Sequence, residues 1–234
     1  MRRATICCAL NDIPYVAYDE FGGLAMIVIW AQVIGAGDTL TTSRVLTTGR
    51  SALGRCCVRV LAIAAMSADG YIARSEHDTV SWSSPEDKRM FAATSRRAGV
   101  IVMGRHTFES MPEPLPDRLQ IVMTHTPEAF QPSPTQVEFT KSSPDGILRD
   151  LATRGFEEVI IGGGGAVYAQ FVNANLVDEL WLTVEPLLFG SGVPLLSGTQ
   201  ADQRMRLVSV TQLSINSLQL KYALDAENRE QSSR

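Results

Sequence analysis

Short apolar runs alternate with longer amphipathic segments from residue 58 to residue 224. The runs at 58–66, 100–103 and 119–124 have few charges and many β-branched residues, which is typical of buried strands. Segments with helical spacing separate many of the apolar runs. The pattern predicts further strands at 137–139, 159–161 and 178–186, and helices that start near residues 85, 105, 144 and 166.

The order of these elements predicts an α/β fold. Strands that alternate with helices favour a mostly parallel central sheet with helices on both faces, a three-layer α/β/α arrangement. Two alternating segments, 205–210 and 218–224, flank Asn216 and Ser217 and predict an antiparallel C-terminal hairpin at one edge. In such sheets ligands bind beyond the carboxyl ends of the strands, so residues that follow strands are the first candidates for a site.

The first 57 residues differ from this pattern. Their apolar stretch at 21–37 is shorter than the roughly 20 residues that span a bilayer, and Asp12, Asp19 and Glu20 do not suit a signal peptide. We expect a poorly ordered extension of unknown role, or upstream sequence from a misplaced start; a membrane-associating or partner-binding hairpin is the alternative. A peptide from residues 1–50 in mass spectrometry would exclude the misplaced start. Residues 58–224 form the expected domain, and 225–234 a charged tail.

Composition narrows the function class. A hydrophobic fraction of 45% and a charged fraction of 20% are ordinary for a globular protein, and a net charge of −4 argues against a nucleic-acid partner. The three histidines have no ligand spacing, so no metal site is predicted. The four cysteines form two adjacent pairs rather than a C-x-x-C motif, which favours free thiols in a reducing compartment and a cytoplasmic location.

Two strand–glycine–helix junctions are the main candidates for chemistry. The run at 159–161 ends in four glycines, 162–165, and a helical segment follows at once. The run at 100–103 ends at Gly104, directly before Arg105, His106 and Thr107. Glycines let the backbone approach a ligand, and free N–H groups at a helix start favour a phosphate.

Together the two junctions predict a nucleotide clamp. Arg105 suits a terminal phosphate such as the 2′-phosphate of NADPH, and His106 can donate to a pyrophosphate oxygen. Thr107 and Thr124 add hydroxyl donors. The glycines lack the G-x-G-x-x-G spacing after a first strand, and no Gly-Lys-Ser/Thr sequence is present, so a Rossmann dehydrogenase and a P-loop protein are both disfavoured.

Asp87 is the best candidate acid, although a helix cap also explains it. Ser84 and Pro85 open a helix, and Asp87 lies at the capping-box position. Phe91 lies four residues later, on the same helix face, and Trp82 lies just upstream. An acid beside aromatic rings suits a flat nitrogen heterocycle.

These residues carry a resemblance to the dihydrofolate reductase superfamily, in the branch that contains the reductase domain of riboflavin-biosynthesis proteins. M-G-R-H-T-F-E-S at 103–110, P-L-P-D-R at 114–118 and I-G-G-G-G-A-V-Y at 161–168 resemble dihydrofolate reductase motifs. The segments at 65–73, 176–180 and 186–192 are similar to the riboflavin branch. The resemblance covers residues 58–224 and implies a dihydrofolate reductase-like fold with NADPH-dependent hydride transfer.

The resemblance also implies roles for individual residues. It assigns the adenosine end and phosphates of NADPH to Gly104, Arg105, His106, Thr107 and Thr124; the pyrophosphate and nicotinamide to Gly163, Gly164, Gly165, Ala166, Val167 and Tyr168; and the nicotinamide region to Ala65 and Ile72. It makes Asp87 the substrate-binding and catalytic acid, and it assigns substrate contacts to Trp82, Phe91, Arg118 and Thr183.

Three functions stay open at this point. The riboflavin branch implies reduction of 5-amino-6-(5-phosphoribosylamino)uracil, yet neither a deaminase domain nor a lysine near the first strand is present. Dihydrofolate reductase proper is the second candidate, although the end of the chain departs from it. The third is an NADPH-binding protein without catalysis. The expected partner is a small-molecule substrate, with no membrane; the riboflavin branch also implies a homodimer through a sheet edge.

Overall fold

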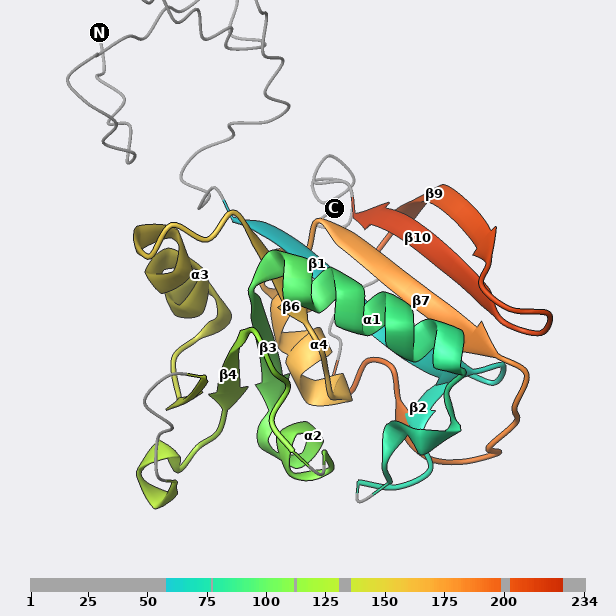
Figure 1. Ribbon diagram of the computed structural model, residues 1–234, viewed down its shortest axis with the longest axis horizontal. Helices are drawn as coiled ribbons and strands as arrows, with labels where there is room; N and C mark the ends of the chain where they lie inside the picture. Colours follow the sequence, from blue (N-terminus) through green and yellow to red (C-terminus); the bar gives the residue numbers. More distant parts are fainter. Residues whose placement is uncertain (1–57, 77, 112, 131–135, 199–202, 225–234) are drawn as a thin grey trace, which may run out of the picture. The chain divides into compact units, whose positions relative to one another are not determined.

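The computed structural model describes residues 58–76, 78–111, 113–130, 136–198 and 203–224 (Figure 1). These residues belong to one compact unit, Cys56–Arg234. The predictions of an extension over 1–57 and a tail over 225–234 lie outside the described residues.

An eight-stranded sheet with the order β5-β4-β3-β6-β1-β7-β10-β9 forms the centre of the fold (Figure 1). The parallel strands are β1 (Arg59–Ser67), β3 (Val100–Gly104), β4 (Leu119–Met123), β5 (Val137–Thr140), β6 (Glu158–Ile161) and β7 (Glu179–Glu185). The antiparallel strands are β9 (Met205–Gln212) and β10 (Leu218–Leu224). The predicted parallel sheet with an antiparallel C-terminal hairpin is confirmed.

A second, two-stranded sheet escaped the sequence prediction. It pairs β2 (Tyr71–Ala73) with β8 (Val193–Pro194). The hydrophobic pattern predicts no strand at either place. Strands of two and three residues have too little alternation to be recognised from a pattern.

Helices cover both faces of the large sheet and complete three layers. They are α1 (Pro85–Ala98), α2 (Arg105–Glu109), α3 (Pro144–Thr153) and α4 (Gly165–Asn173), with short 3₁₀ turns at Val80–Trp82 and Pro127–Ala129. Alternate residues of β1 enter two different cores: Val60 packs with α3 and α4, and Leu61 packs with Met90 and Phe91 of α1. The helix α1 therefore covers one face of the sheet, and α3 and α4 cover the other.

The four helix starts fall into two kinds. The hydroxyl of Ser84 accepts from the backbone N–H of Asp87 at the start of α1, and that of Ser143 accepts from Gly146 at the start of α3. In contrast, α2 and α4 begin after Gly104 and Gly164, and neither start has a side-chain cap. The N–H of Val167 bonds to the Gly164 carbonyl at 2.9 Å, whereas the N–H groups of Gly165 and Ala166 at the start of α4 have no partner among the described residues.

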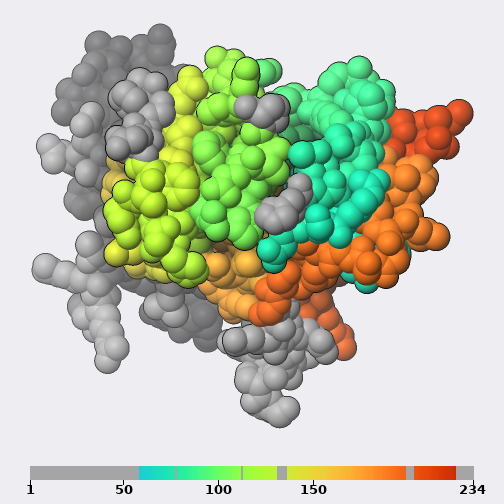
Figure 2. Space-filling view, turned by 90° about the horizontal axis from the view of Figure 1, so that it is seen from below, coloured from blue at the N-terminus to red at the C-terminus, as the bar shows by residue number. Residues whose placement is uncertain are grey.

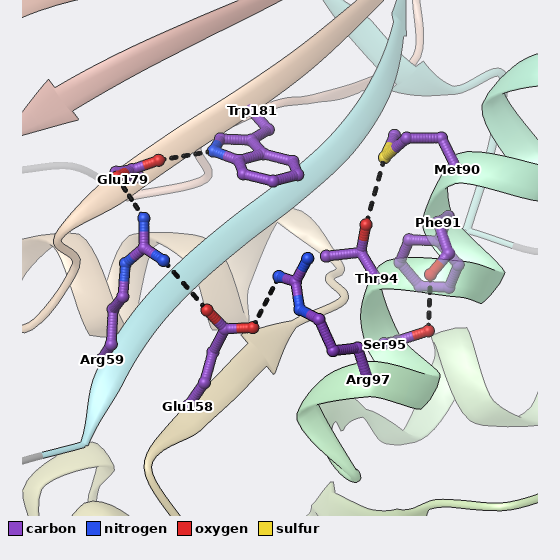
Figure 3. A network of polar contacts seen from close by, with 9 residues as sticks. All are labelled: Arg59, Met90, Phe91, Thr94, Ser95, Arg97, Glu158, Glu179 and Trp181. Carbon is purple, nitrogen blue, oxygen red and sulfur yellow. Dashed lines mark hydrogen bonds and ion pairs between the residues drawn. The ribbon is translucent and has the colours of Figure 1, made fainter.

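An ion-pair network holds the amino ends of the central strands (Figure 3). Arg59 of β1 bridges Glu158 of β6 and Glu179 of β7, and Arg97 of α1 adds a second bond to Glu158. The indole N–H of Trp181 donates to Glu179 at 2.8 Å. These groups lie at the opposite end of the strands from the glycine junctions, and they bond to one another.

None of the helices in the described ranges is long and apolar enough to cross a membrane.

Candidate active site

The carboxyl ends of β1, β3, β6 and β7 meet at one edge of the sheet. These strands are neighbours and run parallel, so the segments that follow them emerge together. Figure 2 looks toward this edge and shows residues near 71–82 (teal), 104–115 (green) and 186–195 (orange) side by side. Both predicted glycine junctions belong to this end of the molecule.

The two glycine junctions form one continuous surface. The N–H of Gly104 donates to the carbonyl of Gly163 at 2.8 Å. A Cβ added at Gly164 would lie 3.3 Å from the Thr107 hydroxyl, and one added at Gly104 would lie 3.2 Å from a methyl of Val167. Gly163 has φ +106°, which side chains rarely adopt. The structure thus brings together the residues that the sequence placed in two halves of a clamp.

Two residues of the predicted clamp have side chains that are buried in the core. Val167 and Tyr168 are 5% and 3% exposed. The Tyr168 hydroxyl donates to the carbonyl of Ile63 at 2.5 Å, and burial raises the pKa of that hydroxyl. Both side chains support the turn from inside the core, and both N–H groups bond to the Gly164 carbonyl, at 2.9 and 3.1 Å.

Positive charge gathers where β3, β4 and β5 end. Arg105 follows β3, and its guanidinium bonds to Glu109 at 3.1 and 3.2 Å and to a ring nitrogen of His106 at 2.8 Å. His125 and Lys141 follow β4 and β5 closely, and those strands pair Met123 with Thr140. His125 and Lys141 are not among the residues predicted from the sequence, although each closely follows a strand, as Arg105 does.

Asp87 is enclosed in the first turn of α1, with 5% of its surface exposed. Burial raises the pKa of its carboxyl, the hydroxyls of Thr183 and Ser83 lower it, and the charge of Glu185 raises it further, so the net shift is upward. Thr183 is fully buried. Its hydroxyl lies close enough to the Asp87 carboxyl to lower the pKa of that group, but it makes no hydrogen bond of standard geometry in the described structure. A raised pKa brings a carboxyl closer to the range in which it can act as a general acid.

Phe91 lies next to the glycine turn at 162–165, on the same face of α1 as Asp87. It lies one helical turn after Asp87 on α1, and its ring would be 3.5 Å from a Cβ at Gly162. Ala65 of β1 pairs in register with Thr183 of β7, next to the same carboxyl. The predicted acid and ring therefore share a helix face, and that face covers the strand ends from β6 to β7.

One member of an aromatic pair, Trp82, lies just before α1 in the sequence. Trp82 packs edge-on against Phe189 with ring centroids 5.1 Å apart, and the Arg74 guanidinium lies 4.5 Å from the centre of the Phe189 ring. The indole N–H of Trp82 is buried and has no hydrogen-bond partner in the described structure. A polar group of a ligand or an ordered water would satisfy it.

Asp69 holds this aromatic pair in place. Its carboxylate accepts from the N–H groups of Phe189 at 3.1 Å and Gly190 at 2.7 Å, and from the Ser67 hydroxyl at 2.6 Å. The Ser67 hydroxyl and these backbone donors lower the pKa of Asp69, so the carboxylate stays charged. Asp69 was not among the residues predicted from the sequence, because its two backbone donors belong to a loop about 120 residues later.

Comparison with known proteins resolves the family. The model of the RibD C-terminal domain matches residues 59–218. The chain belongs to the RibD C-terminal domain family. Dihydrofolate reductase type 3 of Salmonella typhimurium is 34% identical over 121 residues, which cover 52% of this chain and 68% of that protein.

Solved structures agree with this assignment. A protein of Shewanella sp. PV-4, named for riboflavin biosynthesis, is 25% identical with a TM-score of 0.61, over 72% of this chain and 99% of that one. Dihydrofolate reductase of Enterococcus faecalis in complex with NADP(H) is 24% identical with a TM-score of 0.53, over 71% and 96%, and this likeness concerns the fold. The family and its relatives make the chain an oxidoreductase with a dihydrofolate reductase-like fold.

Within this RibD C-terminal domain, Arg118 is used by the protein itself. It is 5% exposed, and its guanidinium donates to the Pro116 carbonyl at 2.9 Å and to the Ser95 hydroxyl. Ser95 lies eight residues after Asp87 on α1, or about 12 Å along the helix. The structure does not bring Arg118 to Asp87, and its role toward a substrate carboxylate stays a prediction that would require these bonds to open.

The RibD C-terminal domain offers no metal cage in its described residues. No group of three or more His, Cys, Asp or Glu side chains there could hold a metal ion. His106 and His125 are both exposed and belong to no such group.

Proposed function

We propose that the chain is an NADPH-dependent reductase that transfers a hydride to a C=N carbon of a pterin- or pyrimidine-like substrate. The observation that carries this proposal is the buried Asp87 carboxyl, held in α1 opposite the glycine turn at 162–165. A raised pKa in such a position suits an acid that protonates the nitrogen of the C=N bond while its carbon accepts a hydride.

The glycine junctions and nearby cations fit NADPH. The uncapped N–H groups of α4 suit the pyrophosphate, and the absent Cβ at Gly164 lets it approach beside Thr107. Arg105 and Lys141 suit the 2′-phosphate that distinguishes NADPH from NADH. When bound, the cofactor supplies a hydride, which carries two electrons.

The chain's own residues orient the substrate and complete the proton balance. Asp87 binds the ring nitrogens, Phe91 packs against the ring, and Trp82 donates from its unsatisfied N–H. With a hydride from the cofactor, the carbon of the substrate's C=N bond would be reduced, and its nitrogen would take one proton from Asp87. In a pterin this bond lies in the ring, and in a ribosylaminopyrimidine it is the open-chain imine between the first sugar carbon and its amino nitrogen. Solvent then returns a proton to the carboxylate.

The riboflavin-type substrate, 5-amino-6-(5-phosphoribosylamino)uracil, is our first choice because the family model and the Shewanella relative support it. Dihydrofolate is the second, because the type 3 dihydrofolate reductase of Salmonella typhimurium is 34% identical. Oxidation of NADPH should be followed by absorbance with each substrate. Turnover with one alone identifies it, and NADPH binding without turnover of either contradicts the proposed reaction.

Replacing Arg105 by alanine should weaken NADPH binding by roughly 10- to 100-fold, the worth of one charge-assisted hydrogen bond, and should leave NADH binding nearly unchanged. Titration of both cofactors by fluorescence measures the two constants. Arg89, which lies exposed on α1 and pairs with Glu86, is the matched control for loss of an arginine. An equal loss for both cofactors would show that Arg105 does not contact the 2′-phosphate.

The edge hairpin supports the expected homodimer. Met205, Leu207, Val208 and Val210 of the edge strand β9 are 41–54% exposed. An exposed edge strand presents unpaired backbone N–H and C=O groups, and with apolar side chains it is suited to pair with a second copy of the chain. Light scattering should give twice the monomer mass, and Val210→Lys should return it to the monomer value. A monomer at high concentration would contradict this prediction.

A further inference from the structure

Glu185, the last residue of β7, is a buried carboxylate that the proposed reaction does not use. It is 3% exposed, and it and Asp87 are the two buried acidic residues in the described part of the chain. Burying a carboxylate is costly unless hydrogen bonds and neighbouring groups compensate for lost water.

Hydrogen bonds to Glu185 connect the C-terminal hairpin to α1. One carboxylate oxygen accepts from the backbone N–H of Ser84 at 2.8 Å, and the other accepts from the Ser217 hydroxyl at 2.6 Å. Both oxygens of Glu185 therefore have a hydrogen-bond donor. Ser84 is the cap of α1, and its own hydroxyl accepts from the N–H of Asp87 at 3.3 Å. One short series of contacts therefore runs from β10 through Glu185 to the backbone of Asp87.

The side chains of Glu185 and Asp87 also lie on the same face of the sheet. Trp181, Thr183 and Glu185 alternate along β7 and so point to the same side. Trp181 packs in the core that includes Phe91 of α1, so this side is the one that α1 covers. Thr183 acts on the Asp87 carboxyl, and Glu185 lies two residues, or about 7 Å, further along the strand.

The groups that face Asp87 are Glu185 and Thr183 from β7, Lys88 from α1, Ser83 before α1, and Tyr168 from α4. Burial is the largest influence on the pKa of Asp87 and raises it, and the negative charge of Glu185 acts in the same direction. Lys88 and the two hydroxyls oppose this rise. Burial and the charge of Asp87 both raise the pKa of Tyr168, so that phenol stays neutral.

We propose that Glu185 is a positioning residue for proton delivery: it anchors the first turn of α1 through the Ser84 N–H and places a second carboxylate on the face of the sheet where Asp87 lies. The inference rests on the proposed reductase function for its purpose, but its physical content is a coupling between two carboxyls. Glu185 itself touches neither substrate nor cofactor.

The Glu185→Gln substitution removes the negative charge but keeps an acceptor for the Ser84 N–H at the start of α1. Glutamine keeps an oxygen for the Ser84 N–H and is nearly the same size, but it carries no charge. With ¹³C-labelled aspartate, the carboxyl signal of Asp87, identified by its loss in Asp87→Asn, should titrate at lower pH in Glu185→Gln than in the wild type. An unchanged midpoint in a folded variant overturns the proposal.

Two further proteins make the test specific. Glu179→Gln is the matched control, because Glu179 lies on the same strand six residues, or about 20 Å, away and should leave the Asp87 titration unchanged. In the wild type with ¹³C-labelled glutamate, the Glu185 signal should follow the titration of Asp87, and this response should vanish in Asp87→Asn. A Glu185 signal that ignores Asp87 overturns the coupling without relying on the stability of Glu185→Gln.

Activity measurements then connect the coupling to catalysis. If protonated Asp87 is the active form, kcat/KM falls as pH rises through its pKa, and Glu185→Gln should move this fall to lower pH while KM for NADPH stays constant. Each unit of movement lowers the rate on the alkaline side tenfold. The absence of any turnover would defeat the proposed function but leave the carboxyl titrations valid, whereas turnover with an unmoved pH profile would defeat the role of Glu185 alone.

Discussion

Replacing Asp87 by asparagine should lower turnover by roughly 10²- to 10⁴-fold, the contribution of a well-placed general acid. Asparagine still hydrogen-bonds to a heterocycle, but it has no proton to deliver. Affinity for NADPH should stay within a factor of about two, because the glycine junctions and the cations after β3 to β5 are untouched. Stopped-flow absorbance for turnover and fluorescence titration for cofactor binding measure both quantities.

The neighbouring Glu86 provides the control for this substitution. It precedes Asp87 on α1, pairs with Arg89 and is partly exposed, so Glu86→Gln should leave turnover unchanged. Full activity of Asp87→Asn would remove the carboxyl from the mechanism. Equal losses in both variants would indicate damage to α1 rather than loss of an acid.

Asp87→Asn should also raise the free energy of unfolding at neutral pH. The pKa of Asp87 is raised by burial in the folded state, so the folded protein binds its proton more tightly than the unfolded chain does. Stability from this group is present at low pH and is lost as pH rises from the unfolded pKa through the folded pKa. Asparagine removes this loss, so urea unfolding should show an advantage that grows with pH. A loss of activity with a gain of stability is typical of a functional residue.

The second large effect should come from Gly165→Ala. A Cβ at this position would lie 2.6 Å from the Pro194 carbonyl and 2.7 Å from the Ser197 hydroxyl, so the segment after β8 must move. We expect a loss of about 1–3 kcal/mol in the free energy of unfolding, the usual effect of overpacking. The movement also distorts the start of α4, and NADPH affinity should fall at least roughly tenfold, equivalent to about 1.4 kcal/mol.

Gly146→Ala is the matched control for the glycine substitution. Gly146 lies in the first turn of α3, where a new Cβ would meet only Ser143 and Ser142, at 3.4 and 3.7 Å. Alanine is the better helix former, so stability should stay the same or rise by less than about 1 kcal/mol. Urea unfolding and cofactor titration of both variants complete the comparison. Unchanged binding in Gly165→Ala would argue against a phosphate at the start of α4.

Local signals were enough to predict much of the fold. Strand, glycine and helix follow one another directly at Gly104 and at residues 162–165, and the Ser84 cap lies within three residues of Asp87. Each of these features depends on neighbours in the sequence. The parallel sheet and the C-terminal hairpin followed from the order of such elements, and the structure and the family confirm them.

Distant contacts explain what the sequence could not predict. In the sequence Glu185 is a charged residue at the end of a strand, and only the fold shows that the C-terminal hairpin and α1 bury it. Asp69 is followed by Gly70, as in an ordinary turn, and only the fold brings the backbone of Phe189 and Gly190 to its carboxylate. Arg118 matches a substrate-binding motif, yet in the structure its side chain bonds to groups of the protein. The roles of the site residues stay predictions that the substitutions above would test.

The position of β1 in the sheet has a consequence for biosynthesis. β1 is the first strand of the described domain, yet it lies between β6 and β7, and its Arg59 reaches partners 99 and 120 residues further along. A growing chain therefore exposes the apolar strand β1 until most of the domain has left the ribosome. Such late closure slows folding and leaves the nascent chain prone to aggregation, so molecular chaperones should matter more for the yield of this protein than for a helical bundle of equal length.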